Sequence, residues 1–301
     1  MRIVVALGGN ALLRRGEPPD ADIQRRNIAA AARAIAPIVR SHEVVVTHGN
    51  GPQIGLLALQ AVAYRGAEAD PLDVLGAETE GAIGYLLETA LANAVSDRRV
   101  ATLLTQVIVD PDDPAFAAPT KPIGPVYDKA EMTRVAAAKG WPMIADGGGW
   151  RRAVPSPMPC AIREIDAVGL LLAAGWVVIC AGGGGIPVVA GRDGAYRGVE
   201  AVVDKDFAAA LVAERLAADH LLLLTDVPGV WAEWPNPKGP PIKAASPHAL
   251  RRLAFAAGSM APKVEAACRF VERTGRTAAI GAIEDAEAVL RGEAGTVVRS
   301  T

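Results

Sequence analysis

The stretch Ile3-Val4-Val5-Ala6-Leu7-Gly8-Gly9-Asn10-Ala11 runs from five apolar residues directly into a glycine pair. An apolar run without polar alternation is typical of a strand that is buried on both faces of a parallel sheet. A glycine turn that follows such a strand and precedes a helical stretch presents backbone N–H groups to an anion. The stretch therefore predicts a parallel sheet whose first strand ends at an anion site. A glycine pair in this place can also be purely structural, so the motif alone is a weak signal.

The same alternation continues along the whole chain, where short β-branched runs are separated by stretches rich in alanine and leucine. We expect strands at residues 3–7, 43–47, 101–109, 176–181, 221–225 and 277–281. We expect helices at residues 23–39, 74–95, 206–217 and 263–273. This pattern predicts an α/β sandwich, in which helices cover both faces of a mainly parallel sheet.

Length and composition bound the possible functions. With 301 residues, 51% of them hydrophobic, the chain can bury a full core. It has no apolar run of about eighteen residues, so we expect no membrane span and a cytoplasmic location. A net charge of −2 without a basic block argues against nucleic acid as a partner. Three scattered cysteines suggest neither disulfides nor a metal knuckle, and we expect them to be small core residues.

A second glycine-rich turn follows the second expected strand, in Thr47-His48-Gly49-Asn50-Gly51-Pro52-Gln53. The carboxyl ends of neighbouring parallel strands meet at one edge, so both turns can line the same crevice with N–H donors. His48 is a candidate general base. Phosphoryl transfer depends more on positioning and charge neutralisation than on proton removal, and we therefore favour a structural role for His48.

Three further turns carry glycine or polar residues after expected strands. Gly182-Gly183-Gly184-Gly185 permits unusual backbone conformations, which suggests close approach to a ligand, although a tight chain reversal is the alternative. Thr225 and Asp226 follow a very apolar strand, where the ribose or base of a nucleotide can bind. The motif Gly258-Ser259-Met260-Ala261-Pro262-Lys263 precedes a helix.

Lysine is rare in this chain, since the 31 basic residues comprise 24 arginines and 7 lysines. An ammonium group is a compact charge that can follow a moving phosphoryl group, whereas a guanidinium is a rigid fork. Lys205 lies between Asp204 and Asp206, whose carboxylates can hold it in one pose, although a surface ion pair is the alternative. Lys263 begins a helix, where a cation opposes the helix dipole and so suggests an anionic partner.

The texture of the chain changes between residues 110 and 159, which are rich in proline and glycine. We expect a small protruding subdomain at residues 112–158, inserted in a single domain of residues 1–301. A long ordinary surface loop is the alternative, but such loops are uncommon without a function. Lys121 stands between prolines that would stiffen it as part of a lid.

Several strings closely resemble carbamate kinases, a branch of the amino acid kinase fold, in order from end to end. They are ALGGNAL (6–12), THGNGPQIG (47–55), PLDVLGAETEGAIGYLL (71–87), PTKPIGP (119–125), GWRRAVPSPMP (149–159), AGGGGIPV (181–188), GVEAVVDKD (198–206), LLLTDVPGVW (222–231), GSMAPKVEAACRFVE (258–272) and GTVV (295–298). The resemblance implies a three-layer αβα sandwich around a mainly parallel eight-stranded sheet, a protruding lid and a homodimer.

The resemblance also implies an activity. A phosphoryl group would pass reversibly from carbamoyl phosphate to ADP, which gives ATP and carbamate. Mg²⁺ would be held mainly by the nucleotide phosphates and water, without a protein metal site. The direction that forms ATP would serve the catabolism of arginine, agmatine or similar nitrogen compounds. Transfer would be direct and in line, without a phosphoenzyme.

Site residues carry over from the resemblance position by position. The carbamoyl phosphate and the transferred group would lie against Gly8, Gly9, Asn10, Gly49, Asn50 and Gly51. The catalytic group would comprise Lys121, Lys205, Lys263 and Asp206, with Asp206 orienting the lysines and Lys121 replacing a lysine that other amino acid kinases carry beside the first glycine turn. The nucleotide would be bordered by Gly182, Gly183, Asp204, Thr225, Asp226 and Met260.

The chain departs from the family pattern at three positions. Ala261 replaces a usual glycine, and Glu78 and Glu80 replace a usual methionine and glutamine, which we expect to affect a dimer surface rather than the chemistry. Two other functions stay open: a kinase of this fold with a different small acid or phosphate monoester as acceptor, and a sensor without activity. The four charged groups Lys121, Lys205, Lys263 and Asp206 argue against a sensor, because a pure binder does not need them.

Overall fold

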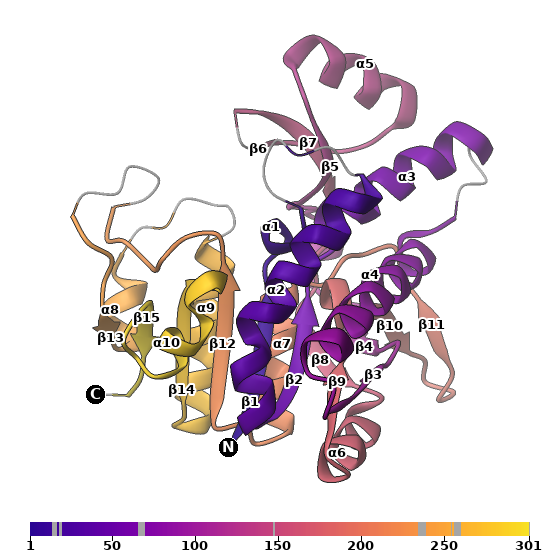
Figure 1. The fold of residues 1–301 in the computed structure, drawn as a ribbon. Coiled ribbons are helices and arrows are strands. Elements are labelled where there is room, and N and C mark those ends of the chain that lie inside the picture. Colours follow the sequence, from indigo (N-terminus) through magenta and orange to yellow (C-terminus); the bar gives the residue numbers. More distant parts are fainter. Residues whose placement is uncertain are drawn as a thin grey trace.

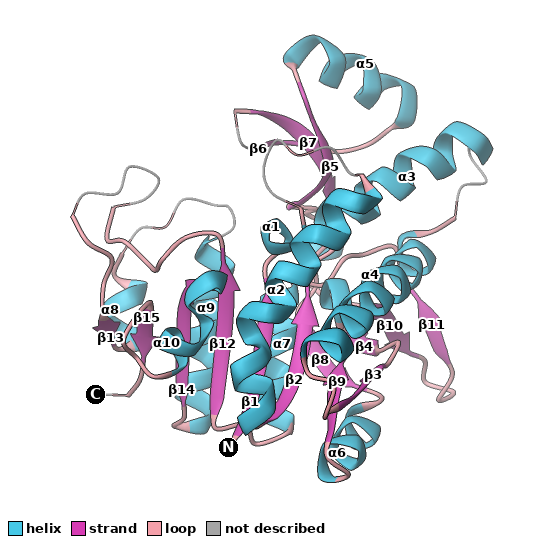
Figure 2. Cartoon of the chain, viewed as in Figure 1, coloured by secondary structure: helices cyan, strands magenta, loops and turns pink. Residues whose placement is uncertain are grey.

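The fold is described from a computed structural model, which covers residues 1–13, 17, 20–65, 70–146, 148–233, 239–253, 255 and 260–300. Its central element is an eight-stranded sheet (Figures 1 and 2). The strands lie in the order β13 (Ala244–Ala245), β15 (Thr296–Val298), β14 (Thr277–Ala282), β12 (His220–Thr225), β1 (Arg2–Leu7), β2 (Glu43–His48), β9 (Trp176–Ile179) and β3 (Arg99–Thr102). Neighbouring strands pair in parallel except β14 and β15. The predicted mainly parallel sheet is confirmed.

Helices cover both faces of this sheet. Successive residues of each strand point to opposite faces, so each strand contributes side chains to the core on either side. From β1, Ile3 and Val5 pack against α2 (Ala21–Ser41), α4 (Leu72–Ala94) and α10 (Ala286–Leu290). Val4 and Ala6 contribute to the core beneath α6 (Ile165–Ala173), α7 (Lys205–Arg215), α8 (Pro247–Arg251) and α9 (Met260–Thr274). Two apolar cores therefore separate three layers, as expected for an αβα sandwich (Figure 1).

The strand expected at residues 101–109 is wrong, because two strands in different sheets occupy this stretch. β3 ends at Thr102, and β4 (Gln106–Val109) belongs to a second sheet ordered β11 (Tyr196–Gly198), β10 (Ile186–Ala190), β4 and β8 (Pro159–Ile162). Between them, the Thr105 N–H leaves the ladder and donates to a side chain, Glu80 Oε2, at 3.2 Å. The sequence hides the break because Val100 before it and Val107 after it are both buried apolar residues.

A three-stranded sheet with one helix projects from the body of the molecule (Figure 1). It contains β5 (Lys121–Tyr127), α5 (Lys129–Lys139), β6 (Met143–Asp146) and β7 (Gly149–Val154), with β7 in the middle. We call residues 121–154 the protruding unit. It contacts α3 (Gly51–Arg65), the helix that follows the second glycine turn, through the backbones of Gly55 and Gly124, which lie so close that a Cβ at Gly55 would fall 1.9 Å from Gly124 Cα.

The cysteines follow the prediction only in part. Cys180 and Cys268 are buried, whereas Cys160 is exposed.

Among the helices that the structure describes, none combines the length and the apolar character needed to cross a bilayer.

Candidate functional site

Four strands bring their following turns to one edge of the central sheet. β12, β1, β2 and β9 are adjacent and parallel, so their carboxyl ends lie side by side. The Gly8 N–H donates to Leu224 O at 2.9 Å, and the Gly49 N–H donates to Leu7 O at 3.0 Å. These bonds join the carboxyl ends of β12, β1 and β2, where the turns begin. Ligands of parallel sheets bind at this edge.

The first two glycine turns contact each other and one lysine. A Cβ added at Gly49 would lie 3.0 Å from Gly9 N and 3.1 Å from Lys205 Cδ. Gly9 begins the short helix α1 (Gly9–Leu12), which includes Asn10, whose side chain lies outside the described part of the structure. Gly51 begins α3. The absence of side chains at these positions therefore lets two backbones and the Lys205 stem converge.

Asn50 is held in one orientation from two sides. Its Nδ2 donates to Thr79 Oγ1 of α4 at 2.8 Å, and Thr79 Oγ1 donates to Gly76 O at 2.9 Å. On the other side, Gly183 has a φ of 67° and approaches so closely that a Cβ there would fall 2.1 Å from Asn50 Nδ2. The buried amide of Asn50 is thus clamped between α4 and the third glycine turn.

A buried cluster of charges forms at the start of α7. Asp204 is the N-cap, and its Oδ1 accepts the Asp206 N–H at 2.9 Å. Lys205 Nζ lies 2.5 Å from Asp206 Oδ1, and Lys263 Nζ from α9 lies 3.2 Å from Asp206 Oδ2. One carboxylate therefore orients two lysines that enter from different helices.

The charges in this cluster shift one another. Burial opposes ionisation of Asp206, yet the attraction of Lys205 and Lys263 holds the pKa of Asp206 below its ordinary value. Burial also lowers the pKa of Lys205, a shift that Asp206 opposes and Lys263 reinforces. Two ammonium groups thus share one buried carboxylate, and Lys121 also attracts it.

The protruding unit reaches this cluster through Lys121, whose ammonium hydrogen-bonds Asp204 Oδ2. A second ion pair joins Arg152 Nη2 of β7 to Glu200 Oε1 at 3.1 Å, and Glu200 Oε2 accepts the Leu72 N–H at 2.8 Å. The protruding unit is thereby connected to α7 and to the start of α4.

His48 lies at the site but is fully buried, and its Nδ1 lies 3.2 Å from Gly49 O. Burial lowers the pKa of His48 to about 4, so the imidazole is neutral at pH 7. Its Nε2 has no hydrogen-bond partner within the described part of the chain. These features support a structural role rather than that of a base.

The third glycine turn has a strained backbone that is held from below. Ala181 has a φ of 49°, and its N–H donates to Thr105 Oγ1 at 3.0 Å. The Gly182 N–H donates to Glu80 Oε1 at 3.0 Å. Glu80 is fully buried, so the expectation that it lies at a dimer surface is wrong; Glu78, two residues earlier on α4, is exposed.

The remaining predicted nucleotide residues lie at the same edge or next to it. Thr225 ends β12, and its Oγ1 donates to Asp226 Oδ1 at 3.1 Å. A Cβ at Gly8 would lie 3.6 Å from Thr225 Cα, which brings Thr225 beside the first turn. Met260 is the first residue of α9 and is buried in the core between α7 and α9. Gly258 and Ser259 of the same motif lie outside the described residues.

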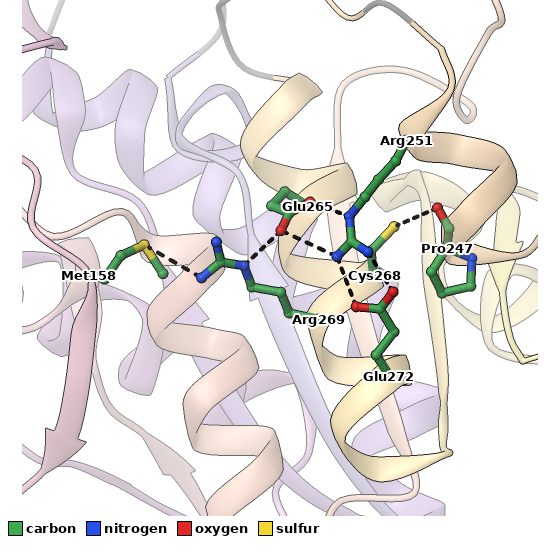
Figure 3. Close-up of polar contacts among 7 residues, drawn as sticks. All are labelled: Met158, Pro247, Arg251, Glu265, Cys268, Arg269 and Glu272. Carbon is green, nitrogen blue, oxygen red and sulfur yellow. Dashed lines mark hydrogen bonds and ion pairs between the residues drawn. The ribbon is translucent and has the colours of Figure 1, made fainter.

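The helix that carries Lys263 is anchored by an ion network (Figure 3). Arg251 of α8 donates to Glu265 Oε2 at 2.9 Å and to Glu272 Oε1 at 2.5 Å, both on α9. Arg269 donates to Glu265 Oε1 at 2.7 Å. Figure 3 shows Arg251 lying between the two glutamates. These ion pairs join α8 to α9, the helix that carries Lys263.

Sequence patterns missed three residues that shape this site, namely Thr79, Glu80 and Thr105. All three contact the site from beneath, through the side chain of Asn50 or the backbone of the third turn. A single polar residue in an apolar helix resembles any satisfied core residue. The adjacent pair Thr79-Glu80 on the buried face of α4 was the available signal.

The edge offers the chemistry of phosphoryl transfer. Glycine backbones approach a common point, and Lys205 and Lys263 supply positive charge beside them. Such groups stabilise negative charge that spreads over phosphoryl oxygens in a loose transition state. Among the described residues, no cluster of three or more His, Cys, Asp or Glu could hold a metal ion.

This chain is similar to known proteins in both sequence and fold. The model of the amino acid kinase family matches residues 1–282. A carbamate kinase of Rhizobium meliloti (strain 1021) is 54% identical over 304 residues, which cover 100% of this chain and 94% of that protein. A structure of the carbamate kinase from Giardia lamblia bound to citric acid has a TM-score of 0.93 at 39% identity, covering 100% of this chain and 98% of that one.

A second structure of the Giardia lamblia carbamate kinase, bound to AMP-PNP, has a TM-score of 0.89 at 38% identity and covers the same shares of the two chains. The similarity therefore extends over the whole sequence and the whole fold. Together with the glycine turns and the lysine cluster at the sheet edge, it shows that the chain belongs to the amino acid kinase family, in its carbamate kinase branch.

Proposed function

We propose that this chain catalyses the reversible transfer of a phosphoryl group between carbamoyl phosphate and ADP, giving ATP and carbamate, which decomposes to ammonia and CO₂. The observation that carries this proposal is the buried cluster in which Asp206 orients Lys205 and Lys263 beside the paired glycine turns. Full-length similarity to carbamate kinases supports the choice of substrates.

The two substrates would bind next to each other at the sheet edge, beside the lysine cluster. Gly8, Gly9, Asn10, Gly49, Asn50 and Gly51 would bind carbamoyl phosphate. Gly182, Gly183, Asp204, Thr225, Asp226 and Met260 would border the nucleotide. The contact of Gly183 with Asn50 supports placing the two substrates next to each other, because it joins one residue of each group.

The transfer needs no nucleophile from the protein. An oxygen of the ADP β-phosphate forms the new bond to phosphorus while the bond from phosphorus to the carbamoyl oxygen breaks, and carbamate leaves with the electron pair. Lys205 and Lys263 would neutralise charge on the oxygens of the transferred group. Lys121 would close over the phosphate from the protruding unit and help exclude water.

Magnesium would come to the site with the nucleotide. The two aspartates of the cluster are already engaged, Asp204 by Lys121 and Asp206 by Lys205 and Lys263. We therefore assign the ion to the phosphates of ADP or ATP and to water, the usual arrangement for Mg²⁺ in kinases.

The cellular setting is a further part of this proposal. The chain would act as a homodimer in the cytoplasm, and would form ATP during the catabolism of arginine or related nitrogen compounds. Light scattering coupled to size-exclusion chromatography tests the dimer directly. A monomer at micromolar concentration would contradict it.

The activity is tested by measuring ATP formation from ADP, Mg²⁺ and carbamoyl phosphate. Acetyl phosphate and acetylglutamyl phosphate serve as competing donors. Turnover selective for carbamoyl phosphate, and reduced at least about 100-fold in Lys205→Ala, is the expected result, since one transition-state charge contact contributes on the order of 3 kcal/mol. Lys243→Ala changes an exposed lysine and is the matched control. Binding of ADP without any turnover of carbamoyl phosphate would refute the proposal.

A further inference from the structure

Glu80 is a buried carboxyl group that the proposed mechanism does not use. It lies on α4, in the middle of the helix, and its exposed fraction is 1%. Among the described residues, no lysine, arginine or histidine forms an ion pair with it. Burying a carboxylate without a cation is very costly, so the group needs another form of compensation.

The compensation comes from backbone N–H groups of two chain segments. Glu80 Oε1 accepts the Gly182 N–H at 3.0 Å, and Oε2 accepts the Thr105 N–H at 3.2 Å. Thr105 Oγ1 donates to Leu103 O at 2.9 Å and accepts the Ala181 N–H at 3.0 Å, so the same residue also holds the glycine turn.

The backbone of the turn that these groups hold is strained. Ala181 has a φ of 49°, and Gly183, Gly184 and Gly185 have φ values of 67°, 99° and 81°. A non-glycine residue in this region costs free energy that the surroundings must offset. Thr105 and Glu80 take the N–H groups of Ala181 and Gly182, the two residues at which the chain enters the turn.

The titratable groups around Glu80 also disfavour its charged form. Glu164, at the start of α6, repels a negative charge on it. Cys180, directly after β9, has its pKa raised first by burial and then by the two glutamates. From β2, His48 packs against the same glycine, since a Cβ at Gly182 would lie 2.3 Å from His48 Nε2 and 3.0 Å from Glu80 Cγ. Burial raises the pKa of Glu80 to about 8, which the Thr105 and Gly182 N–H groups only partly oppose.

We propose that Glu80 is a positioning residue for the glycine turn Gly182–Gly184 and holds it as a neutral carboxylic acid. In that form it accepts both N–H bonds and carries no uncompensated charge. When the proton is lost, repulsion from Glu164 and the cost of burial favour a rearrangement of α4 against the turn. The turn borders the nucleotide in the proposed function, on which this inference rests, and the expected consequence is weaker binding of ADP at alkaline pH.

The test compares Glu80→Gln, Glu80→Ala and the wild type in KM for ADP and in kcat between pH 6 and pH 9.5. Glutamine keeps a carbonyl acceptor for Gly182 and cannot ionise. Glu80→Ala is expected to raise the KM for ADP at least about tenfold at every pH, with kcat changed less than about threefold, because it removes both acceptors. Glu78→Gln, on the exposed face of the same helix, should match the wild type throughout.

The ratio of wild-type KM to that of Glu80→Gln isolates the proton on Glu80, because every other titrating group is common to both proteins. This ratio should stay constant below about pH 7 and rise above about pH 8, by up to about tenfold per pH unit for a single proton. Parallel profiles of the two proteins, or a wild-type KM for ADP in Glu80→Ala, would overturn the inference.

A measurement that does not depend on activity separates this inference from the proposed function. A carboxyl whose pKa is raised from 4.5 to about 8 on folding contributes stability that is complete below pH 4.5 and is lost as the pH rises through about 8. The Tm of the wild type should therefore fall relative to that of Glu80→Gln between about pH 5 and pH 8, and the difference should then level off. A wild type without carbamoyl phosphate turnover would refute only the function, whereas a constant Tm difference would refute the role of Glu80.

Discussion

The ammonium group of Lys121 hydrogen-bonds the carboxylate of Asp204, which lies 83 positions further along the chain. Lys121 begins β5 of the protruding unit, whereas Asp204 caps α7, beside the buried pair of Lys205 and Asp206. The side chain that we assign to the transferred phosphoryl group is thus directed at the lysine cluster. Its partner Asp204 would have to release it when a phosphate arrives.

Lys121→Ala should reduce kcat at least about 100-fold while changing the dissociation constant of ADP less than about threefold. The reason is that Lys121 enters from the protruding unit, and Lys205 and Lys263 remain to bind the nucleotide phosphates. Steady-state kinetics and calorimetric titration with ADP measure the two quantities. Lys129→Ala, an exposed lysine of the same unit, should leave both unchanged. Equal damage to rate and ADP affinity would rule out the separate role of Lys121.

Thr79→Val should raise the KM for carbamoyl phosphate about five- to tenfold. Valine has the shape of threonine but cannot accept the hydrogen bond from Asn50 Nδ2, and a bond of this kind contributes about 1 kcal/mol. The amide of Asn50 then loses its fixed orientation. Thr89→Val is the matched control, because Thr89 lies on the same helix, is exposed, and donates to Tyr85 O within that helix. The same KM in both variants would mean that Thr79 does not position Asn50.

The sequence allowed the sheet edge to be predicted well, because local chemistry decides it. An apolar strand followed by glycine, as at Leu7 and Gly8, is a local pattern that parallel strands impose on the chain. The helices expected at residues 23–39 and 263–273 lie within α2 and α9, since their apolar residues recur with helical spacing and are buried in the cores. What depends on neighbouring residues in the chain was thus recoverable.

Features that depend on distant segments could not be recovered. The break between β3 and β4 relies on Thr105, whose N–H is accepted by Glu80 of α4. The burial of Glu80 itself depends on the third glycine turn, 102 positions further along the chain. A glutamate in a helix ordinarily indicates a solvated face, and only the packing of α4 against the turn reverses that expectation.

Gly55→Ala should destabilise the protein by about 1–3 kcal/mol and slow turnover, because the added methyl group overlaps the Gly124 backbone and displaces the protruding unit. Thermal unfolding and limited proteolysis within residues 121–154 report the two effects. Gly76→Ala is the matched control, since nothing lies within 4 Å of a Cβ at that helical position. It should be neutral or stabilise the protein by up to about 1 kcal/mol. Equal stability of both variants would show that α3 and β5 can separate without cost.

Asp206→Asn should lower kcat at least about 100-fold and reduce the acid sensitivity of the fold, because Asp206 is the carboxylate that Lys205 and Lys263 share. The lysines hold its folded pKa below the ordinary value of 3.8, so its contribution to stability is present above about pH 4 and is lost as the pH falls through the folded value. Urea unfolding at pH 7 should show a loss of about 3 kcal/mol in the variant, and the deficit should shrink toward pH 2. Asp97→Asn, at an exposed aspartate, should follow the wild type at every pH. A deficit that does not vary with pH would mean that Asp206 acts through its shape and hydrogen bonds rather than through its charge.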